Sequence, residues 1–243
     1  MDLHLQGRQA LVTGGSAGIG LAIVQALAAE SCAVAFCGRD EARIQAALQT
    51  CQGLPGAVTG RKLDVRDIQA FGRWLDELGR LDVLVLNVSA LSGDWGEALS
   101  TDVQATVACA EAAIPKLLRS DAAAISYIGS MAGSLAAPTS AAYGAAKAAM
   151  AHYMKSLSAR LLPKVRVNTV SPGDTLFEGG LRDRVQREEP EVFAKVLQRN
   201  PMQRLADPAE VARVVAFISC PAASFVSGAN WYADGGSVAH VQF

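Results

Sequence analysis

The chain has 243 residues, of which 51% are hydrophobic, and a formal net charge of -1. This length suits one domain with a sizeable core, and the near-neutral charge gives no electrostatic reason to expect nucleic acid or an anionic membrane as a partner. The five cysteines form no Cys-x-x-Cys pair, no cluster has zinc-ligand spacing, and the amino-terminal residues lack an export signal. We therefore expect reduced thiols, no metal and a cytoplasmic location.

Short apolar runs alternate with helix-length segments along the whole chain. The runs predict strands at Ala10–Thr13, Ala33–Cys37, Ala57–Leu63, Val83–Val88, Ala123–Ile128, Val165–Val170 and Asn230–Ala233. Helical patterns lie near Ile19–Ala29, Asp40–Gln49, Asp67–Leu78, Thr101–Leu118, Ala141–Leu161 and Pro208–Ser219. Strands that are apolar on both faces and alternate with helices predict a parallel sheet covered on both sides. We expect one doubly wound α/β domain over residues 1–243, with a seven-stranded parallel sheet.

The uncharged stretch between Asp121 and Lys147 is long enough to cross a membrane. Its many Ala, Gly and Ser residues, with Pro138 among them, argue instead for a buried strand followed by a loop and a helix start. We therefore expect no membrane partner.

The longest irregular stretch runs from about Ser171 to Met202 and contains a charged helical patch from Leu181 to Gln198. It follows the carboxyl end of a strand, which is where such folds bind ligands. We expect a substrate-loop insertion over about residues 174–202. The apolar side chains expected to form a wall there are Phe177, Leu181 and Phe193. Three arginines are expected on a solvated face: Arg182, Arg184 and Arg187.

The first strand runs directly into a glycine-rich turn, Thr13-Gly14-Gly15-Ser16-Ala17-Gly18-Ile19-Gly20, and a helix follows. Glycine lets the backbone turn tightly and approach a ligand that a Cβ would block. The helix start offers unpaired N–H groups to a pyrophosphate. A merely tight strand–helix connection is the alternative, but three spaced glycines favour a nucleotide-phosphate site.

Tyr143 and Lys147 are four residues apart in an Ala-rich helical segment and therefore share one helix face. A core tyrosine beside a surface lysine is the alternative. Reduction of a carbonyl develops alkoxide charge, which needs a proton donor within hydrogen-bonding reach. An ammonium about 4 Å away contributes roughly 4 kcal/mol at an effective dielectric of 20, so the lysine is expected to lower the pKa of the tyrosine.

The joint order of these motifs resembles the short-chain dehydrogenase/reductase family. Nearly the whole chain takes part, through the glycine turn, Asp64-Val65, Asn87, Ser130, Tyr143-x-x-x-Lys147, Pro172-Gly173 and Asp234-Gly235-Gly236. The resemblance implies a Rossmann-type fold and an NAD(P)-dependent oxidoreductase that interconverts a ketone and a secondary alcohol. The resemblance also implies a homodimer or homotetramer, because the family commonly pairs two helices between subunits. The corresponding segments here are Val103–Leu118 and Ala141–Leu161. Both segments are apolar or small nearly all round.

The resemblance implies roles for individual residues. Tyr143 is the expected acid/base, and Ser130 is expected to donate a hydrogen bond to the substrate oxygen. Lys147 is expected to lower the pKa of Tyr143 through its charge and to bind the ribose. Asp64 is expected at the adenine, with helix capping near Asp67 as its alternative role. The expected cofactor-binding residues are Gly14, Ser16, Gly18, Ile19, Gly20, Arg39, Asp64, Val65, Asn87, Tyr143, Lys147, Pro172, Gly173 and Thr175.

The end of the second strand bears on the choice of nicotinamide. An acidic residue there would favour NAD, but Cys37 and Gly38 carry no carboxylate and Arg39 follows. A guanidinium suits a phosphate dianion, and Ser16 adds a hydroxyl donor. The alternative is that Arg39 is only a solvated loop cation before the helix cap at Asp40. We predict a preference for NADP over NAD.

Three positions depart from the family pattern. The Asn-Asn-Ala-Gly that the family usually has after strand four is Asn87-Val88-Ser89-Ala90 here. The family's active-site asparagine, counted back from Pro115, falls on Asp102, which adds a negative charge near Lys147 or serves only as a helix N-cap or helix-side acid. The family's threonine after Pro172-Gly173 is replaced by Phe177, which leaves Thr175 as the nearest hydroxyl.

The sequence leaves four candidate substrate classes: 3-oxoacyl thioesters, sugars, polyols and small cyclic ketones. The alternative function is a non-catalytic NADP-binding regulator that has lost turnover through Asp102. An epimerase of the extended family is disfavoured, because no substantial substrate domain follows Pro172.

Overall fold

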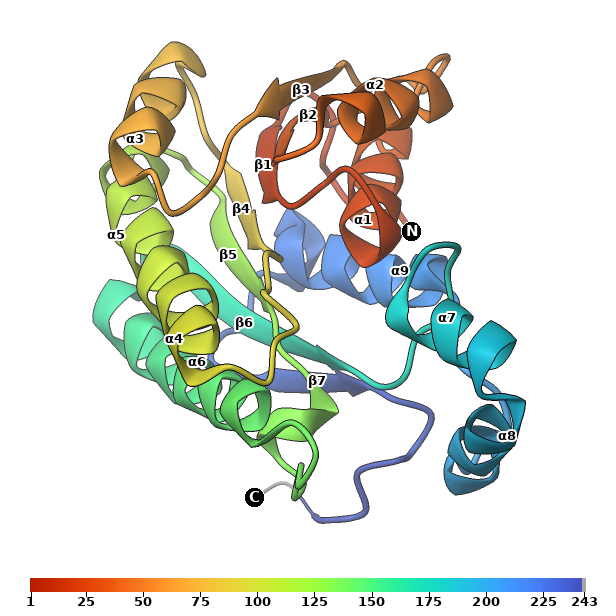
Figure 1. Ribbon diagram of the computed structural model, residues 1–243. Helices are drawn as coiled ribbons and strands as arrows, with labels where there is room; N and C mark the ends of the chain where they lie inside the picture. Colours follow the sequence, from red (N-terminus) through yellow and green to blue (C-terminus); the bar gives the residue numbers. More distant parts are fainter. Residues whose placement is uncertain (242–243) are drawn as a thin grey trace.

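Seven strands form one parallel sheet in the computed structural model, which describes residues 1–241 (Figure 1). Their bounds are β1 Gln9–Thr13, β2 Ala33–Gly38, β3 Val58–Lys62, β4 Val83–Leu86, β5 Ala123–Ile128, β6 Val165–Pro172 and β7 Asn230–Ala233. Their order in the sheet is β3-β2-β1-β4-β5-β6-β7. The expected doubly wound Rossmann-type fold is confirmed, and the chain reverses its direction of winding between β1 and β4.

Burial of the strands follows their place in the sheet. Every residue of β4, β5 and β6 is buried, as expected for strands covered on both faces. The edge strands β3 and β7 are only partly buried, and β3 carries Arg61 and Lys62. Charge on an edge strand discourages pairing with another chain.

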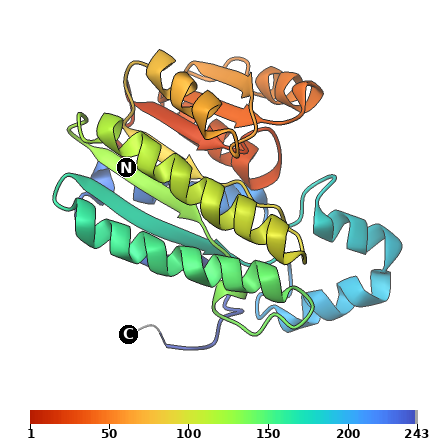
Figure 2. The ribbon, with the colours of Figure 1, turned by 60° about the vertical axis from the view of Figure 1, so that its left-hand side comes forward.

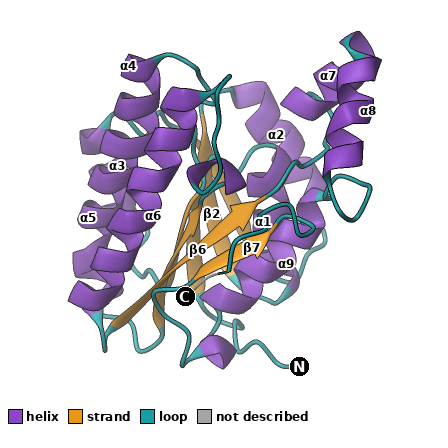
Figure 3. Ribbon diagram, turned by 90° about the horizontal axis from the view of Figure 1, so that it is seen from below, coloured by secondary structure: helices purple, strands orange, loops and turns teal. Residues whose placement is uncertain are grey.

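Helices cover both faces of the sheet (Figures 2 and 3). Their bounds are α1 Gly18–Ala29, α2 Glu41–Thr50, α3 Ile68–Glu77, α4 Trp95–Glu97, α5 Thr106–Leu117, α6 Ala141–Leu161, α7 Leu181–Glu188, α8 Pro190–Arg199 and α9 Pro208–Ser219. The core on one face is formed with α3, α5 and α6, and the core on the other with α1, α2 and α9. Short 3-10 turns occupy Met131–Gly133 and Pro221–Ala223.

The helix expected over Thr101–Leu118 begins earlier and is irregular. Asp94 caps its start by accepting a hydrogen bond from the Glu97 amide at 2.8 Å. A π-helical segment, Ala98–Ala105, joins α4 to α5 and contains Asp102. Segments of π-helix are rare and frequently occur at functional sites.

The charged patch after β6 forms two helices rather than one. The break falls at Glu189, whose φ of -137° is not helical, because the following Pro190 disfavours a helical conformation in the residue before it. The resulting pair, α7 and α8, projects from the body of the protein near the carboxyl ends of the strands (Figure 1).

Among residues 1–241, no helix is long and apolar enough to span a membrane. Over the same residues, no three His, Cys, Asp or Glu side chains are grouped in a way that would hold a metal ion. The five cysteines are free and buried, as the sequence suggested.

Candidate active site

The glycine turn between β1 and α1 is shaped for a close approach of backbone to ligand. Gly14 and Gly18 have positive φ of 67° and 53°, a conformation that favours glycine. A Cβ on Gly20 would lie 2.1 Å from the Gly14 carbonyl oxygen, so only glycine fits there as well. No side chain caps the start of α1 at Ala17, which leaves its first N–H groups available. The turn therefore fits a pyrophosphate.

Asn87 fastens this turn to the neighbouring strand. Its side-chain Nδ2 donates to the carbonyl oxygens of Thr13 and Gly14, at 3.1 and 3.0 Å. Its backbone N–H donates to Thr13 Oγ1 at 2.9 Å. The sequence assigned Asn87 to the ribose site, but the structure also gives it a task within the protein, which the motif alone did not reveal.

The end of β2 places Arg39 beside the glycine turn. A Cβ on Gly38 would lie 2.7 Å from Ser16 Oγ, so the serine hydroxyl lies against the residue before Arg39. The Arg39 side chain is exposed, and its charge helps to lower the pKa of Asp64. Exposed guanidinium and hydroxyl donors at this corner fit the 2′-phosphate of NADP.

Asp64 and Val65 follow β3 near the same corner. The Asp64 carboxylate accepts hydrogen bonds from the Arg66 backbone and guanidinium, which lower the pKa of Asp64 against the effect of its partial burial. The alternative role of Asp64 as a cap is not observed, because α3 is capped by Asp67, which accepts from Ala70 N at 2.9 Å. Val65 is buried.

Ser130, Tyr143 and Lys147 come together where β5 ends against α6. Ser130 lies two residues beyond β5, and its hydroxyl oxygen accepts from Ala132 N at 3.1 Å. Lys147 is buried and its Nζ donates to the Ile128 carbonyl at 3.1 Å. The same Nζ lies 5.5 Å from the centre of the Tyr143 ring. The expected grouping of the three side chains is therefore present.

Asp102 lies in the same centre rather than on the solvent side of its helix. It is 1% exposed, and its Oδ1 lies 3.6 Å from Lys147 Nζ. Its Oδ2 accepts from Ala90 N at 3.0 Å, which fixes the loop after β4. Of the expected alternatives, the structure supports the charge beside Lys147 and not the cap, since Asp94 caps this helix.

The expectation that Lys147 lowers the pKa of Tyr143 is wrong for this arrangement. Burial raises the pKa of Tyr143; the Ser130 hydroxyl opposes the rise, and the charges of Asp102 and Asp174 add to it. Burial also lowers the pKa of Lys147 to about 8, against the effect of Asp102. Burial disfavours the charged tyrosinate, and a nearby carboxylate disfavours it further.

The segment after β6 is held mainly by contacts within the protein. A Cβ on Gly173 would lie 2.8 Å from Asp234 Cα, so the Pro172-Gly173 turn needs glycine against the Asp234-Gly235-Gly236 loop. Thr175 is 8% exposed, and its hydroxyl donates to the Gly173 carbonyl at 3.2 Å. The expected contact between this hydroxyl and a cofactor stays a prediction.

Phe177 lies elsewhere than the sequence suggested. A Cβ on Gly18 would come within 2.6 Å of Phe177 Cζ, so the ring packs on the glycine turn and not on a substrate wall. Arg182 also departs from expectation, because it forms a partly buried ion pair with Asp174 at 2.6 Å. The pair ties the start of α7 to the segment beyond Gly173.

The chain matches, over residues 14–238, the family model described as Enoyl-(Acyl carrier protein) reductase. It belongs to the short-chain dehydrogenase/reductase family. The isoepoxydon dehydrogenase patN of Penicillium expansum is 33% identical, with 98% of each chain covered. The structure of the Pseudomonas aeruginosa RhlG/NADP active-site complex has a TM-score of 0.89 at 28% identity, covering 97% of this chain and 98% of that one. NAD+-bound xylitol dehydrogenase has a TM-score of 0.89 at 26% identity, covering 96% and 99%.

As a short-chain dehydrogenase/reductase, the protein is a nicotinamide-dependent oxidoreductase that acts on alcohol and ketone groups. One of these two solved structures contains NADP and the other NAD.

Sequence reasoning missed Tyr127, which shares the centre of this dehydrogenase/reductase. Tyr127 is a fully buried residue of β5, and Lys147 Nζ lies 5.0 Å from the centre of its ring. Its hydroxyl and Asp102 Oδ1 are two of the three buried side-chain polar atoms without a hydrogen-bond partner within residues 1–241. The only signal in the sequence was an aromatic residue three positions before Ser130.

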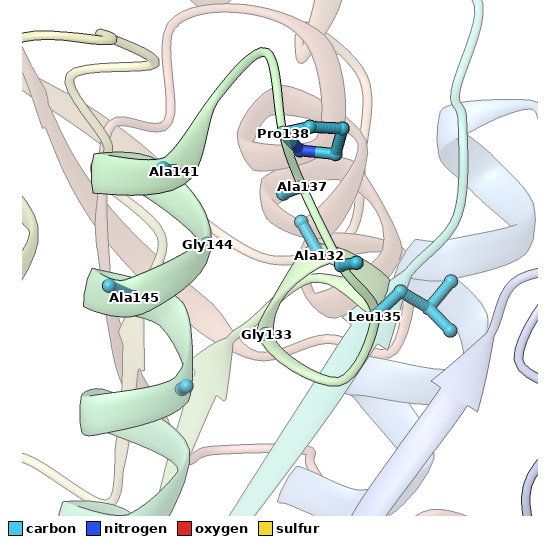
Figure 4. A pocket seen from close by; sticks show the side chains of 10 residues that line it. Ala132, Gly133, Leu135, Ala137, Pro138, Ala141, Gly144 and Ala145 are labelled. Carbon is cyan, nitrogen blue, oxygen red and sulfur yellow. The ribbon is translucent and has the colours of Figure 1, made fainter.

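An apolar hollow of about 400 Å³ lies between the loop after β5 and the first turns of α6 (Figure 4). Gly144, Ala145 and Ala148 line it from the helix. At about 100° per residue, this side of α6 points roughly 130° away from Tyr143 and Lys147. The hollow therefore lies on a different side of α6 from Tyr143 and Lys147.

Proposed function

We propose that the protein is an NADP-dependent oxidoreductase that interconverts a ketone and a secondary alcohol. The observation that carries this proposal is the meeting of Ser130, Tyr143 and Lys147 at the same sheet edge as the glycine turn. Bound NADPH would supply the hydride and NADP+ would accept it. Every other task falls to side chains of this chain.

In the reductive direction, Ser130 donates a hydrogen bond to the carbonyl oxygen and polarises it. Tyr143 transfers its hydroxyl proton to the same oxygen as alkoxide charge develops. Lys147 is held by the Ile128 carbonyl and lies beside Tyr143, and we propose that it also binds the ribose. Because its pKa is raised, Tyr143 is protonated at neutral pH and begins the reductive step with its proton in place.

Tyr143→Phe tests this assignment, because it removes the proton donor and keeps the ring. We expect turnover to fall by about a hundredfold or more while NADPH affinity stays within about twofold. NADPH oxidation in a ketone assay gives the first quantity, and a fluorescence titration the second. Retained turnover would refute the role of Tyr143.

The preference for NADP rests on Arg39, with Ser16 beside it. Arg39→Asp should weaken NADPH binding by about a hundredfold and NADH binding far less, because a carboxylate repels the 2′-phosphate. Equal losses for the two cofactors would refute the preference. Arg43, in the first turn of α2, offers a control charge change: Arg43→Asp should leave the ratio of the two affinities nearly unchanged.

The substrate is a small carbonyl compound or alcohol, and we propose that residues 174–202 select it. Candidate classes are 3-oxoacyl thioesters, small cyclic ketones, sugars and polyols. An NADPH-oxidation screen across these classes identifies the one that is used. Tight NADPH binding with no turnover on any of them would favour the second candidate, a non-catalytic NADP-binding regulator, for which the Asp102 charge at the centre is the supporting observation.

We also propose that the protein acts in the cytoplasm as a homodimer or homotetramer. The small residues Ala145, Ala148 and Ala149 are exposed on one side of α6. Light scattering after gel filtration gives the oligomeric state. A large side chain, as in Ala149→Arg, should shift an oligomer toward monomer, and an unchanged mass would exclude α6 from the interface.

A further inference from the structure

The proton-transfer centre contains a fully buried ion pair. Asp102 and Lys147 have side chains that are 0% and 3% exposed, and 3.6 Å separates Asp102 Oδ1 from Lys147 Nζ. Asp102 Oδ1 has no hydrogen-bond donor among residues 1–241, so the ammonium is the group that compensates its charge. The pair gives the centre a net charge near zero, where an asparagine would leave it positive.

Every titratable group that faces the Asp102–Lys147 pair and Tyr143 affects the net charge of the centre. Tyr127 faces Lys147 from β5 and is neutral, because burial raises its pKa well above the ordinary value. Asp174 approaches Tyr143 from the segment after β6, but it is paired with Arg182. Asp102 is therefore the carboxylate that acts on Lys147 and Tyr143 without an arginine partner, and its charge also adds to the raised pKa of Tyr127.

We propose that Asp102 is a positioning residue that holds Lys147 and Tyr143 in their protonated forms and so keeps this centre a proton donor at alkaline pH. The inference rests on the proposed reductase function. Reduction needs both protons, one on Tyr143 for transfer and one on Lys147 to support the tyrosine. A negative charge in contact raises the proton affinity of its neighbours, and low dielectric at a buried site strengthens the effect.

The test is the pH dependence of ketone reduction by Asp102→Asn. Asparagine keeps the shape and an acceptor for Ala90 N but removes the charge. The alkaline break in kcat/KM should move down by about one pH unit or more, whichever of the two groups gives up its proton first. For each enzyme, the rate near about pH 9 is divided by its own rate on the neutral plateau. This relative rate should be about tenfold lower for the variant than for the native enzyme. A break within about 0.3 units of the native one would overturn the proposal.

Tyr127→Phe is the matched control, because it alters an equally buried neighbour of Lys147 without changing any charge. Its break should stay at the native pH. No variant alters the equilibrium constant of the reaction, so the ratio of the reductive to the oxidative rate does not report on Asp102. The pH at which kcat/KM breaks does report on it. A purely structural role for Asp102 would lower kcat/KM at all pH values and leave the break in place.

Two further measurements keep the inference testable if the variant folds poorly or the native protein shows no turnover. The native reductive profile should break no lower than about pH 8, where the pKa of Lys147 lies, and a break below neutral pH would overturn the proposal. The ultraviolet absorption of tyrosinate, with Tyr143→Phe as reference, should appear at lower pH in Asp102→Asn even in a silent protein. Failure of all ketone turnover alongside this shift would reject the proposed function and leave the role of Asp102 standing.

Discussion

Asn87 offers a sharp test of how the cofactor turn is held. Its Nδ2 group donates to the carbonyl oxygens of Thr13 and Gly14 at 3.1 and 3.0 Å. A net contribution of about 1 kcal/mol for each hydrogen bond predicts a loss of about 2 kcal/mol in Asn87→Ala. For a chain of this size, that corresponds to a fall in Tm of about 4–8 °C.

Asn87→Asp should be worse than Asn87→Ala, although aspartate is the closer match in shape. A carboxylate offers two acceptors to two carbonyl oxygens and no donor, so attraction becomes repulsion. Acidification that protonates the new carboxyl restores a donor, and part of the lost stability should return at low pH. Thermal and urea denaturation of the cofactor-free protein measure these effects.

Asn168 provides the control for cofactor binding. It is equally tied into the protein, donating to the Val226 carbonyl at 2.9 Å and accepting from Ala229 N at 3.1 Å. Asn168→Ala should lose similar stability but keep its NADPH affinity, whereas Asn87→Ala should bind NADPH several-fold more weakly. An aspartate variant more stable than the alanine variant at neutral pH would refute the reasoning.

Two further predictions concern cofactor access and acid stability. Phe177→Ala removes the ring from Gly18 and should tighten NADPH binding by about three- to tenfold in a fluorescence titration; weaker binding would mean that the ring holds the cofactor. Burial raises the pKa of Asp82, but Arg80 and two further donors outweigh it and hold the pKa below its ordinary value. A carboxyl of this kind stabilises the fold above its unfolded pKa, and that contribution disappears as pH falls through the folded pKa. The urea midpoint should therefore drop more between about pH 5 and about pH 3 for the native protein than for Asp82→Asn, and parallel curves would contradict this.

Local signals were sufficient for the elements and for the grouping of the catalytic motif. The strand Ala123–Ile128 and the helix Ala141–Leu161 have the bounds expected from the sequence. Their periodicity and composition decide them, because burial on both faces needs a continuous apolar run and a helix face recurs every three to four residues. Tyr143 and Lys147 then share a face by spacing alone.

Other features could not be predicted from the sequence. The start of the helix at Trp95, the π-helical segment and the position of Phe177 on Gly18 all depend on packing between distant segments. Local propensity is a weak guide where tertiary contacts override it. The sequence could name Asp102 as a departure but not decide between a cap and a charge at the centre.

The amino-acid sequence by itself determined the alternation of strands and helices, the glycine turn and the spacing that puts Tyr143 and Lys147 on one helix face. The tertiary structure alone decided their electrostatic state, because the pKa of a buried group depends on burial and on the charges that packing brings within a few ångströms. Asp102 is 45 residues from Lys147 in the chain and 3.6 Å from it in space. Burial is the main reason that the pKa of Tyr143 is raised rather than lowered, and the nearby Asp102 charge adds to the rise.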